Sequence, residues 1–467
     1  MPATAKPQIT SWNVHIKETL KLGVPLIATQ IAQLAIGTTD ILIVGRLGTV
    51  DLAAIVLASH YFLSIFILGS GFSIAVIPMM AQAVQQGNMN NVARYVRMGL
   101  GLSLAFSVVS LPLFQYSELV LLSLGQKPEV VTKAADYLMI AGWAVFPGLS
   151  LMVFRALLIT LRRANIIFYI TVTIFILNAV FAYILVFGYL GAPALGIRGA
   201  AITTVAVNFF GLCCAVIYVQ FVAETKRLKI FFNLWRPDWI LLTEIVRLGF
   251  PIGFLLFAED SLFAVAAIIM GWIGTVELAA HGIAMQLATM AFVVPLGLSQ
   301  VATVRVGLAA GNNDEDGVFK AAISVLMMTI FTAVFGGFLF VFMRETLVGL
   351  FIDPSSTNAD ELLSVASYFV IVAGIFQLFD GLQIVGAGLL RGIRDTTIPM
   401  ALAMLSYWLI GFGGAYILAF QVGLGGIGIW FGFLGGLGSA AILLNLRFFL
   451  LLGFRRTTFA LGKRRLS

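Results

Sequence analysis

Long apolar runs recur throughout this chain of 467 residues, and they constrain its fold more than any other feature. A run of about 20 apolar residues is long enough to cross the roughly 30 Å hydrocarbon core of a bilayer as a helix. Hydrophobic residues make up 60% of the sequence and charged residues only 10%, which excludes an ordinary soluble domain. We therefore expect an all-α integral membrane protein.

The sequence contains twelve such runs. The first 21 residues are polar and lack a short apolar core with a cleavage site, so we expect no removable signal peptide. We predict transmembrane helices at residues 18–44, 53–82, 95–116, 134–158, 165–188, 196–222, 241–272, 278–308, 319–342, 361–390, 397–420 and 425–452.

Positively charged residues are distributed unevenly over the loops between these runs. If both termini are cytoplasmic, five of the 28 Lys and Arg residues fall on the opposite side: Arg46, Lys127, Lys133, Arg198 and Arg344. Membrane proteins carry such an excess of basic residues in their cytoplasmic loops. The net charge of +7 is thus explained by topology, and we expect membrane lipids with acidic headgroups as partners and no nucleic acid.

The chain also repeats itself. The segment VGRLGTVDLAA at 44–54 recurs as MGWIGTVELAA at 270–280, and LGVP at 22–25 recurs as LGFP at 248–251. Each half contains six spans, an even number, so both halves enter the membrane from the same side. This predicts two six-helix bundles related by a pseudo-two-fold axis along the membrane normal, with a substrate cavity between them.

The predicted organisation has three parts. We expect an N-lobe at residues 1–223 with helices 1 to 6, and a C-lobe at residues 241–467 with helices 7 to 12 and a basic cytoplasmic tail. A basic cytoplasmic linker at residues 224–240 joins them, with Trp235 and Trp239 as interface anchors.

Four acidic residues interrupt the apolar runs, namely Glu259, Asp260, Asp380 and Asp40. A carboxylate inside hydrocarbon costs several kcal/mol, so it normally faces a cavity, takes up a proton or holds a cation. Asp260 points about 100° around the helix from Glu259, and we favour Glu259 as the functional one. Asp40 lies near the outer end of its span, where a structural role is the alternative.

Polar amides accompany these acids. Gln377 and Gln383 lie three residues to either side of Asp380, which predicts one polar helix face. Gln30 and Gln33 form a similar stripe with Asp40. We expect these four amides to line the cavity, together with two further candidates that the alternative view treats as helix-packing residues, Asn178 and Asn208.

The two halves do not share the acids. The repeat aligns Glu259 with Gln33, and it aligns Asp40 with Ala266. Glu259 and Asp380 could supply oxygen ligands to Na⁺, or two neighbouring buried carboxylates could share a proton. Either cation would neutralise the predicted site, so a cationic substrate and the coupling ion would compete for it or bias it oppositely.

Several motifs resemble the multidrug and toxic compound extrusion (MATE) family. They are the paired GTVDLAA and GTVELAA segments, TTD at 38–40 and LLRGIRDTTIPM at 389–400. AED at 258–260 with LFDGLQ at 378–383 is similar to its NorM-type bacterial branch. One segment departs from the pattern, because LRRANIIFYI at 161–170 is a weak echo of LRGIRDTTIPM and leaves the symmetry of this hinge open.

The resemblance implies a twelve-helix exporter that exchanges external Na⁺ or H⁺ for cationic, amphipathic drugs. It implies a secondary transporter of the bacterial inner membrane with both termini cytoplasmic, which needs no cofactor beyond the coupling ion. We expect it to work as a monomer.

Two other functions remain as alternatives. An intramembrane aspartyl protease could use Asp40 and Asp380 as a shared-proton pair, but a doubled twelve-span body is superfluous for it. A lipid-linked oligosaccharide flippase of the same superfamily would call for a basic cavity, and the acids argue against one. The sequence has no GxxxxGK[ST] loop, which favours an ion gradient over ATP as the energy source.

Overall fold

A computed structural model of the chain describes residues 11–232, 236–353 and 358–464. Twelve helical spans within these residues are long and apolar enough to cross a membrane, which confirms the predicted number. Trp235, predicted as an interface anchor, lies outside the described residues, as do the side chains of the basic tail from Arg455 onward.

The first half of the chain forms nine helices within the described residues. They are α1 (Trp12–Gly45), α2 (Thr49–Gln85), α3 (Met89–Gln115), α4 (Ser117–Ser123), α5 (Pro128–Ala141), α6 (Val145–Thr160), α7 (Ala164–Phe187), α8 (Ile197–Phe221) and α9 (Ala223–Lys226). A 3₁₀ turn at Gly142–Ala144 joins α5 to α6, so these two helices form a single span.

The second half continues with eight α-helices in the part of the chain that the structure describes. They are α10 (Trp239–Ile273), α11 (Thr275–Gly311), α12 (Glu315–Phe342), α13 (Arg344–Gly349), α14 (Ala359–Gly392), α15 (Thr397–Met404), α16 (Gly413–Tyr416) and α17 (Gly426–Arg464). The span that begins with α15 contains two π-helical segments, Leu405–Phe412 and Ile417–Gln421. Such wider turns are rare and are frequent at functional sites.

The backbone repeats at positions where the sequence does not. Arg162 follows the end of α6 and Arg394 follows the end of α14, and both have left-handed φ angles, 60° and 62°. A non-glycine residue rarely adopts this conformation. The turn is therefore the same in both halves, although LRRANIIFYI only weakly echoes the later segment.

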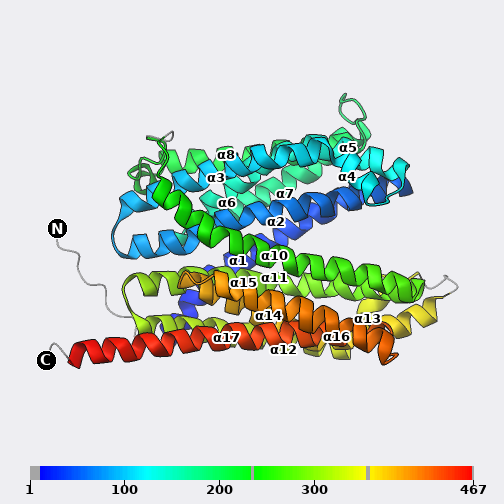
Figure 1. Cartoon of the computed structure of the whole chain (residues 1–467). Coiled ribbons are helices and arrows are strands. Elements are labelled where there is room, and N and C mark those ends of the chain that lie inside the picture. The colour runs from blue at the N-terminus through cyan, green and yellow to red at the C-terminus, as the bar shows by residue number, and fades with distance from the viewer. Residues whose placement is uncertain (1–10, 233–235, 354–357, 465–467) are drawn as a thin grey trace. The chain divides into compact units, whose positions relative to one another are not determined.

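The helices form two compact units, and the division falls inside two helices. Unit 1 comprises Met1–Ile27 and Ala258–Ser467, and unit 2 comprises Ala28–Phe257. The predicted lobes, which follow the sequence repeat, remain a prediction. The two compact units differ from the two repeats in the first halves of α1 and α10, which are exchanged between them. The first half of α1 groups with later helices, and the first half of α10 groups with earlier ones (Figure 1).

Polar contacts hold the first half of α1 within unit 1. Arg305 of α11 is nearly buried and donates a hydrogen bond of 2.9 Å to the carbonyl oxygen of His15. It also contacts the hydroxyl of Thr19 and lies 2.7 Å from Nδ1 of His15. The guanidinium of Arg305 therefore ties the start of α1 to α11.

A glycine contact holds the first half of α10 against α2 within unit 2. A Cβ atom on Gly71 would lie 2.3 Å from the carbonyl oxygen of Gly249, and one on Gly253 would lie 2.4 Å from that of Leu68. Only glycine permits this distance, and small residues commonly allow such close approach between membrane helices.

Helix α14 is the central helix of unit 1. It packs against α11, α12 and α17, and these helices run alongside it (Figure 1). Phe369 and Phe376 of α14 are buried at 1% exposure each. The residues that α14 carries on its inner faces are therefore shielded from lipid.

Candidate cation site

Glu259 of α10 and Asp380 of α14 meet in the interior of unit 1. Their side chains belong to residues that are only 6% and 5% exposed. The Nε2 atom of Gln383 donates to Oε1 of Glu259 at 2.7 Å and to Oδ1 of Asp380 at 3.3 Å. One amide nitrogen thus bridges both carboxylates and makes them neighbours.

A tyrosine fixes the other end of this amide. The hydroxyl of Tyr407 donates to Oε1 of Gln383 at 2.6 Å, and both residues are fully buried. Tyr407 lies in the π-helical segment Leu405–Phe412. One hydroxyl group and two carboxylates therefore fix the orientation of the Gln383 amide, because Oε1 accepts a hydrogen bond and Nε2 donates two.

No salt bridge within the described residues neutralises the acid pair, although the buried guanidinium of Arg391 lies near enough for its charge to act on Glu259. Within the described ranges, neither Glu259 nor Asp380 forms an ion pair. The buried Arg391 donates instead to Oγ of Ser299 at 2.7 Å, and this hydroxyl donates to the carbonyl oxygen of Ile384. Two buried carboxylates carry more negative charge than one nearby guanidinium can balance, which is costly in a membrane and suits a site for a mobile cation.

Aromatic rings lie next to the acid pair. Phe263 is one helical turn beyond Glu259, and Phe376 is one turn before Asp380; their ring centroids lie 6.0 Å apart. Phe433 contacts both rings, at 5.3 and 6.1 Å. Unit 1 therefore places a largely buried aromatic cluster within one helical turn of its two carboxylates along α10 and α14.

The structure does not bring every predicted residue of this unit into the network. Gln377 packs against Gly336 of α12, and its Nε2 atom is buried without a hydrogen-bond partner. Six residues along a helix turn the side chain by about 120°, so Gln377 and Gln383 face different neighbours. Asp260 is half-buried; the amide of Gln383 binds its neighbour Glu259, on which the charge of Asp260 also acts.

A second buried acid lies in unit 2. Asp40 near the end of α1 is 7% exposed and lies beside the fully buried Asn178 of α7. The two side chains are outside hydrogen-bonding geometry, because Oδ1 of Asp40 and both amide atoms of Asn178 lack a partner. Two residues predicted from separate spans are thus neighbours, but no network orders them.

The remaining amides stand apart from Asp40. Gln30 is half-buried and Gln33 is exposed, and no hydrogen bond joins either to Asp40 in the described residues. Asn208 donates to the carbonyl oxygen of Thr204 on its own helix at 2.8 Å. It therefore satisfies a local backbone group and does not take part in the acid site.

Three residues of the site were not predicted from the sequence, namely Tyr407, Ser299 and Arg391. Tyr407 lies in an apolar stretch of the sequence, and only the hydrogen bond of its hydroxyl to Gln383 makes it part of the site. Arg391 lies in a segment with the character of a cytoplasmic helix end, yet it is 7% exposed. A buried arginine within a span is the one signal that could have drawn attention to this region.

The fold and the buried acids define a polytopic membrane transporter. A family model described as MatE matches residues 25–184 and again residues 251–417, which together exceed half of the chain. The two matches begin at the paired Pro25 and Pro251, so the family's unit is present twice. The chain belongs to the MatE family, and the prediction of a MATE-type secondary transporter that is not an enzyme is confirmed.

Curated relatives align over almost the full length. A protein of Rhizobium meliloti named "Probable multidrug resistance protein NorM" is 50% identical over 442 residues, which cover 95% of each chain. A protein of the same name from Agrobacterium fabrum is 50% identical over 441 residues, covering 94% of this chain and 95% of the relative. The similarity to the NorM-type branch is thereby confirmed.

Solved structures share the fold at much lower identity. The structure described as "Crystal structure of MATE in the bent conformation" has a TM-score of 0.85 at 20% identity and covers 97% of this chain and 99% of its own. The eukaryotic MATE transporter AtDTX14 has a TM-score of 0.84 at 19% identity, covering 94% and 96%. These likenesses confirm the all-α, twelve-span, two-bundle fold class.

Proposed function

We propose that the chain is a multidrug efflux antiporter that couples entry of Na⁺ or H⁺ to export of cationic, amphipathic compounds. The observation that carries the proposal is the buried pair of Glu259 and Asp380, which share the amide of Gln383 and form no salt bridge within the described residues. Relatives that are 50% identical bear the name of a multidrug resistance protein. We place it in the bacterial inner membrane with both termini cytoplasmic, in line with the excess of basic residues in the predicted cytoplasmic loops.

The sign of the buried charge supports a cationic cargo. One related structure, a transporter from Pyrococcus furiosus, is described by the words "Reverse polarity of binding pocket suggests different function". In unit 1 of the present chain, two carboxylates lie beside an aromatic cluster. Carboxylates attract cations, and aromatic faces stabilise organic cations, so an anionic lipid-linked sugar is the less suitable cargo.

The amide of Gln383 accounts for how one site could hold either ion. Its Nε2 atom donates to both acids, an arrangement that suits ionised carboxylates. Rotation of the amide by 180° would turn Oε1 toward the acids, where it would bind Na⁺ or accept a hydrogen bond from a protonated carboxyl group. The Tyr407 hydroxyl can follow this rotation, because a hydroxyl group both donates and accepts.

The coupling rule follows from charge. Binding of Na⁺ or H⁺ at Glu259 and Asp380 neutralises the pair and removes the attraction for a cationic drug. A drug bound near the same carboxylates opposes occupation by the ion. Exchange results if the ion and the drug favour different conformations of the transporter, and each must bind its favoured conformation more tightly.

Transport by everted vesicles tests the proposal. Ethidium transport into the lumen of everted vesicles should accelerate when the concentration of Na⁺ or of H⁺ is made higher in the lumen than in the medium. The ion that accelerates it is the coupling ion. Vesicles without the protein, and vesicles whose gradients are collapsed by ionophores, are the controls. Efflux that is indifferent to both gradients would exclude antiport.

A further inference from the structure

A basic pocket lies in unit 2 at the start of α10, and its lining residues are separate from the acid pair of unit 1. It encloses about 420 Å³ between the second turn of α3 and the start of α10. Its charged and aromatic lining consists of Arg94, Arg97, Arg236, Asp238 and Trp239. We call it the arginine pocket. The proposed transport mechanism uses none of these residues.

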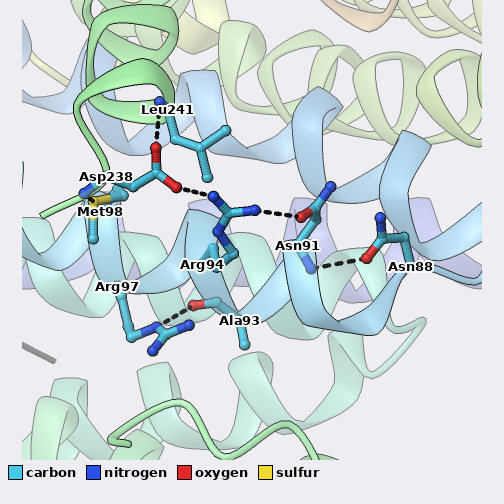
Figure 2. A network of polar contacts seen from close by, with 8 residues as sticks. All are labelled: Asn88, Asn91, Ala93, Arg94, Arg97, Met98, Asp238 and Leu241. Carbon is cyan, nitrogen blue, oxygen red and sulfur yellow. Dashed lines mark hydrogen bonds and ion pairs between the residues drawn. The ribbon is translucent and has the colours of Figure 1, made fainter. Parts of the chain in front are cut away.

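Hydrogen bonds give one wall of the arginine pocket a fixed geometry. Figure 2 shows Arg94 between Asn91, to whose Oδ1 it donates at 3.1 Å, and Asp238, with which it forms an ion pair. Oδ1 of Asp238 accepts from the backbone N–H of Leu241 in the first turn of α10. Asp238 also donates its own N–H to the sulfur of Met98. The start of α10 is thereby attached to α3.

The pocket keeps a surplus of positive charge. Arg97 lies one turn beyond Arg94 and is turned away from Asp238 (Figure 2); its guanidinium donates to the carbonyl oxygens of Ala93 and Phe232. Carbonyl groups satisfy hydrogen bonds but leave the net charge in place. Arg236 is exposed and pairs with no acid in the part of the chain that the structure describes. The arginine pocket is therefore lined by three arginines but by a single carboxylate, that of Asp238.

The position along the helices corresponds to a membrane surface. Two candidate spans begin here, α3 at Met89 and α10 at Trp239. Trp239 is 73% exposed and the neighbouring Ile240 is 82% exposed, so apolar side chains border the basic pocket. Tryptophan and arginine together at the end of a span are typical of the level of the lipid headgroups.

We propose that the arginine pocket binds the phosphate of an anionic phospholipid headgroup, with the acyl chains lying along Trp239 and Ile240. Arginine guanidinium groups bind phosphate through paired, charge-assisted hydrogen bonds. Clusters of basic residues at the end of a span attract anionic lipids. A soluble phosphate would use the same arginines but leave the apolar border uncovered, which favours the lipid. The inference is independent of the proposed ion coupling.

Lipid titration followed by native mass spectrometry tests this inference. Purified protein in detergent is titrated with phosphatidylglycerol and, separately, with zwitterionic phosphatidylcholine. The double variant R97Q/R236Q should bind phosphatidylglycerol roughly 10- to 30-fold more weakly than the wild type, with a much smaller loss for phosphatidylcholine, whose choline group offsets the charge of its phosphate. Arg236→Gln alone should give part of the loss. This exposed side chain has no bond within the described residues, so its loss leaves the fold intact.

A matched control removes the same charge outside the pocket. Lys226 and Arg227 are exposed residues of the same predicted cytoplasmic segment and do not line the pocket. K226Q/R227Q should weaken phosphatidylglycerol binding by less than about threefold, since general attraction alone is reduced. Equal losses in the control and in R97Q/R236Q would overturn the inference, as would an unchanged affinity in R97Q/R236Q and R236Q.

A third variant should act in the opposite direction. Asp238→Asn removes the one carboxylate of the arginine pocket but keeps an oxygen that accepts from Leu241. It should bind phosphatidylglycerol a few-fold more tightly than the wild type, and weaker binding would contradict the inference. In a competition arm, inorganic phosphate at millimolar concentration should not displace the lipid. Displacement by phosphate would identify a soluble anion as the occupant and overturn the lipid assignment.

Discussion

The two buried acid sites differ in how their oxygen atoms are satisfied. In unit 1, Glu259 and Asp380 share one amide nitrogen of Gln383, and Tyr407 orients that amide from behind. In unit 2, Asp40 lies beside Asn178, and no hydrogen bond connects them. Both sites are shielded from solvent, but only the first has an ordered set of partners.

This difference shows what the internal repeat has kept. The helices and even the left-handed turns at Arg162 and Arg394 recur, whereas the polar networks do not. An ordered network fixes ligand geometry before an ion arrives, which lowers the cost of binding it. A buried acid without partners costs folding stability and lacks that preorganisation. We therefore expect the two sites to respond differently to the same kind of substitution.

The largest expected effect concerns the acids of unit 1. Glu259→Gln and Asp380→Asn should each lower gradient-coupled ethidium efflux in everted vesicles by about 100-fold or more, because each removes a charge that alternates between ion and drug. Asp316→Asn is a suitable control, since this exposed acid pairs with Lys320 one turn away. Wild-type efflux in either unit 1 variant would remove that acid from the site.

A smaller loss is expected from the tyrosine behind the amide. Tyr407→Phe leaves the buried Oε1 of Gln383 without its donor and frees the amide to rotate. The concentration of coupling ion that gives half-maximal efflux should rise about tenfold. The matched change Tyr137→Phe in unit 2 removes a weaker contact of 3.3 Å to Thr204 and should leave this concentration unchanged. Equal effects would mean that Tyr407 acts through packing alone.

Substitution of Asp40 should affect stability in the opposite sense. Asp40→Asn replaces a buried carboxylate, whose Oδ1 has no hydrogen-bond partner within the described residues, with an uncharged amide of the same shape, which costs less to bury. We expect the Tm in detergent to rise by about 1 to 3 °C, followed by tryptophan fluorescence. Glu259→Gln replaces a carboxylate that already accepts a hydrogen bond from Gln383, and it should not raise the Tm. A lower Tm for Asp40→Asn would show that the carboxylate has a stabilising partner and would remove the contrast.

The smallest expected effect concerns an acid outside the spans. Burial raises the pKa of Asp238, but hydrogen bonds from Leu241 and Arg94, with the charge of Arg94, outweigh burial and bring this pKa below its usual value. Because this pKa is lower in the folded state, the ionised carboxylate stabilises the folded protein at pH values above the unfolded pKa of about 3.8. The contribution is lost as the pH falls through the folded pKa.

The wild type should therefore have a slightly higher Tm than Asp238→Asn at pH 7, and the difference should shrink as the pH falls below about 3.8 toward the lower folded pKa. Thermal unfolding of both proteins across this pH range measures it. A difference that stays undiminished well below pH 3.8 would mean that the carboxylate charge does not cause the stabilisation.

The sequence predicts the parts of the molecule that local signals encode. Runs of apolar residues determine the twelve spans, and an acid such as Glu259 stands out because charges are rare there. The three-residue spacing of Asp380 and Gln383 was sufficient to predict their shared face, which the 3.3 Å contact bears out. The prediction that Gln377 shares this face with Gln383 went too far, because residues six positions apart differ by about 120° in direction around the helix.

Features that depend on packing between distant segments were not predictable. Nothing near Tyr407 in the sequence indicates that its hydroxyl meets an amide 24 residues earlier. Likewise, the half-helix before Ile27 groups with helices from the other end of the chain, although the repeat suggests a division at the linker. Such choices are decided by contacts like that of Arg305 with His15, whose residues are almost 300 positions apart.

The exchanged half-helices have a mechanical consequence. The polypeptide passes from one unit to the other at two points, Ile27–Ala28 and Phe257–Ala258, and both points are inside continuous helices. Both crossings lie inside a helix and not in a loop, so a hinge motion at either point requires the hydrogen-bonded helical backbone to bend or unwind. The crossing at Phe257–Ala258 lies within one helical turn of Glu259. A bend of α10 at this point would therefore move Glu259, one of the two carboxylates that would bind the ion.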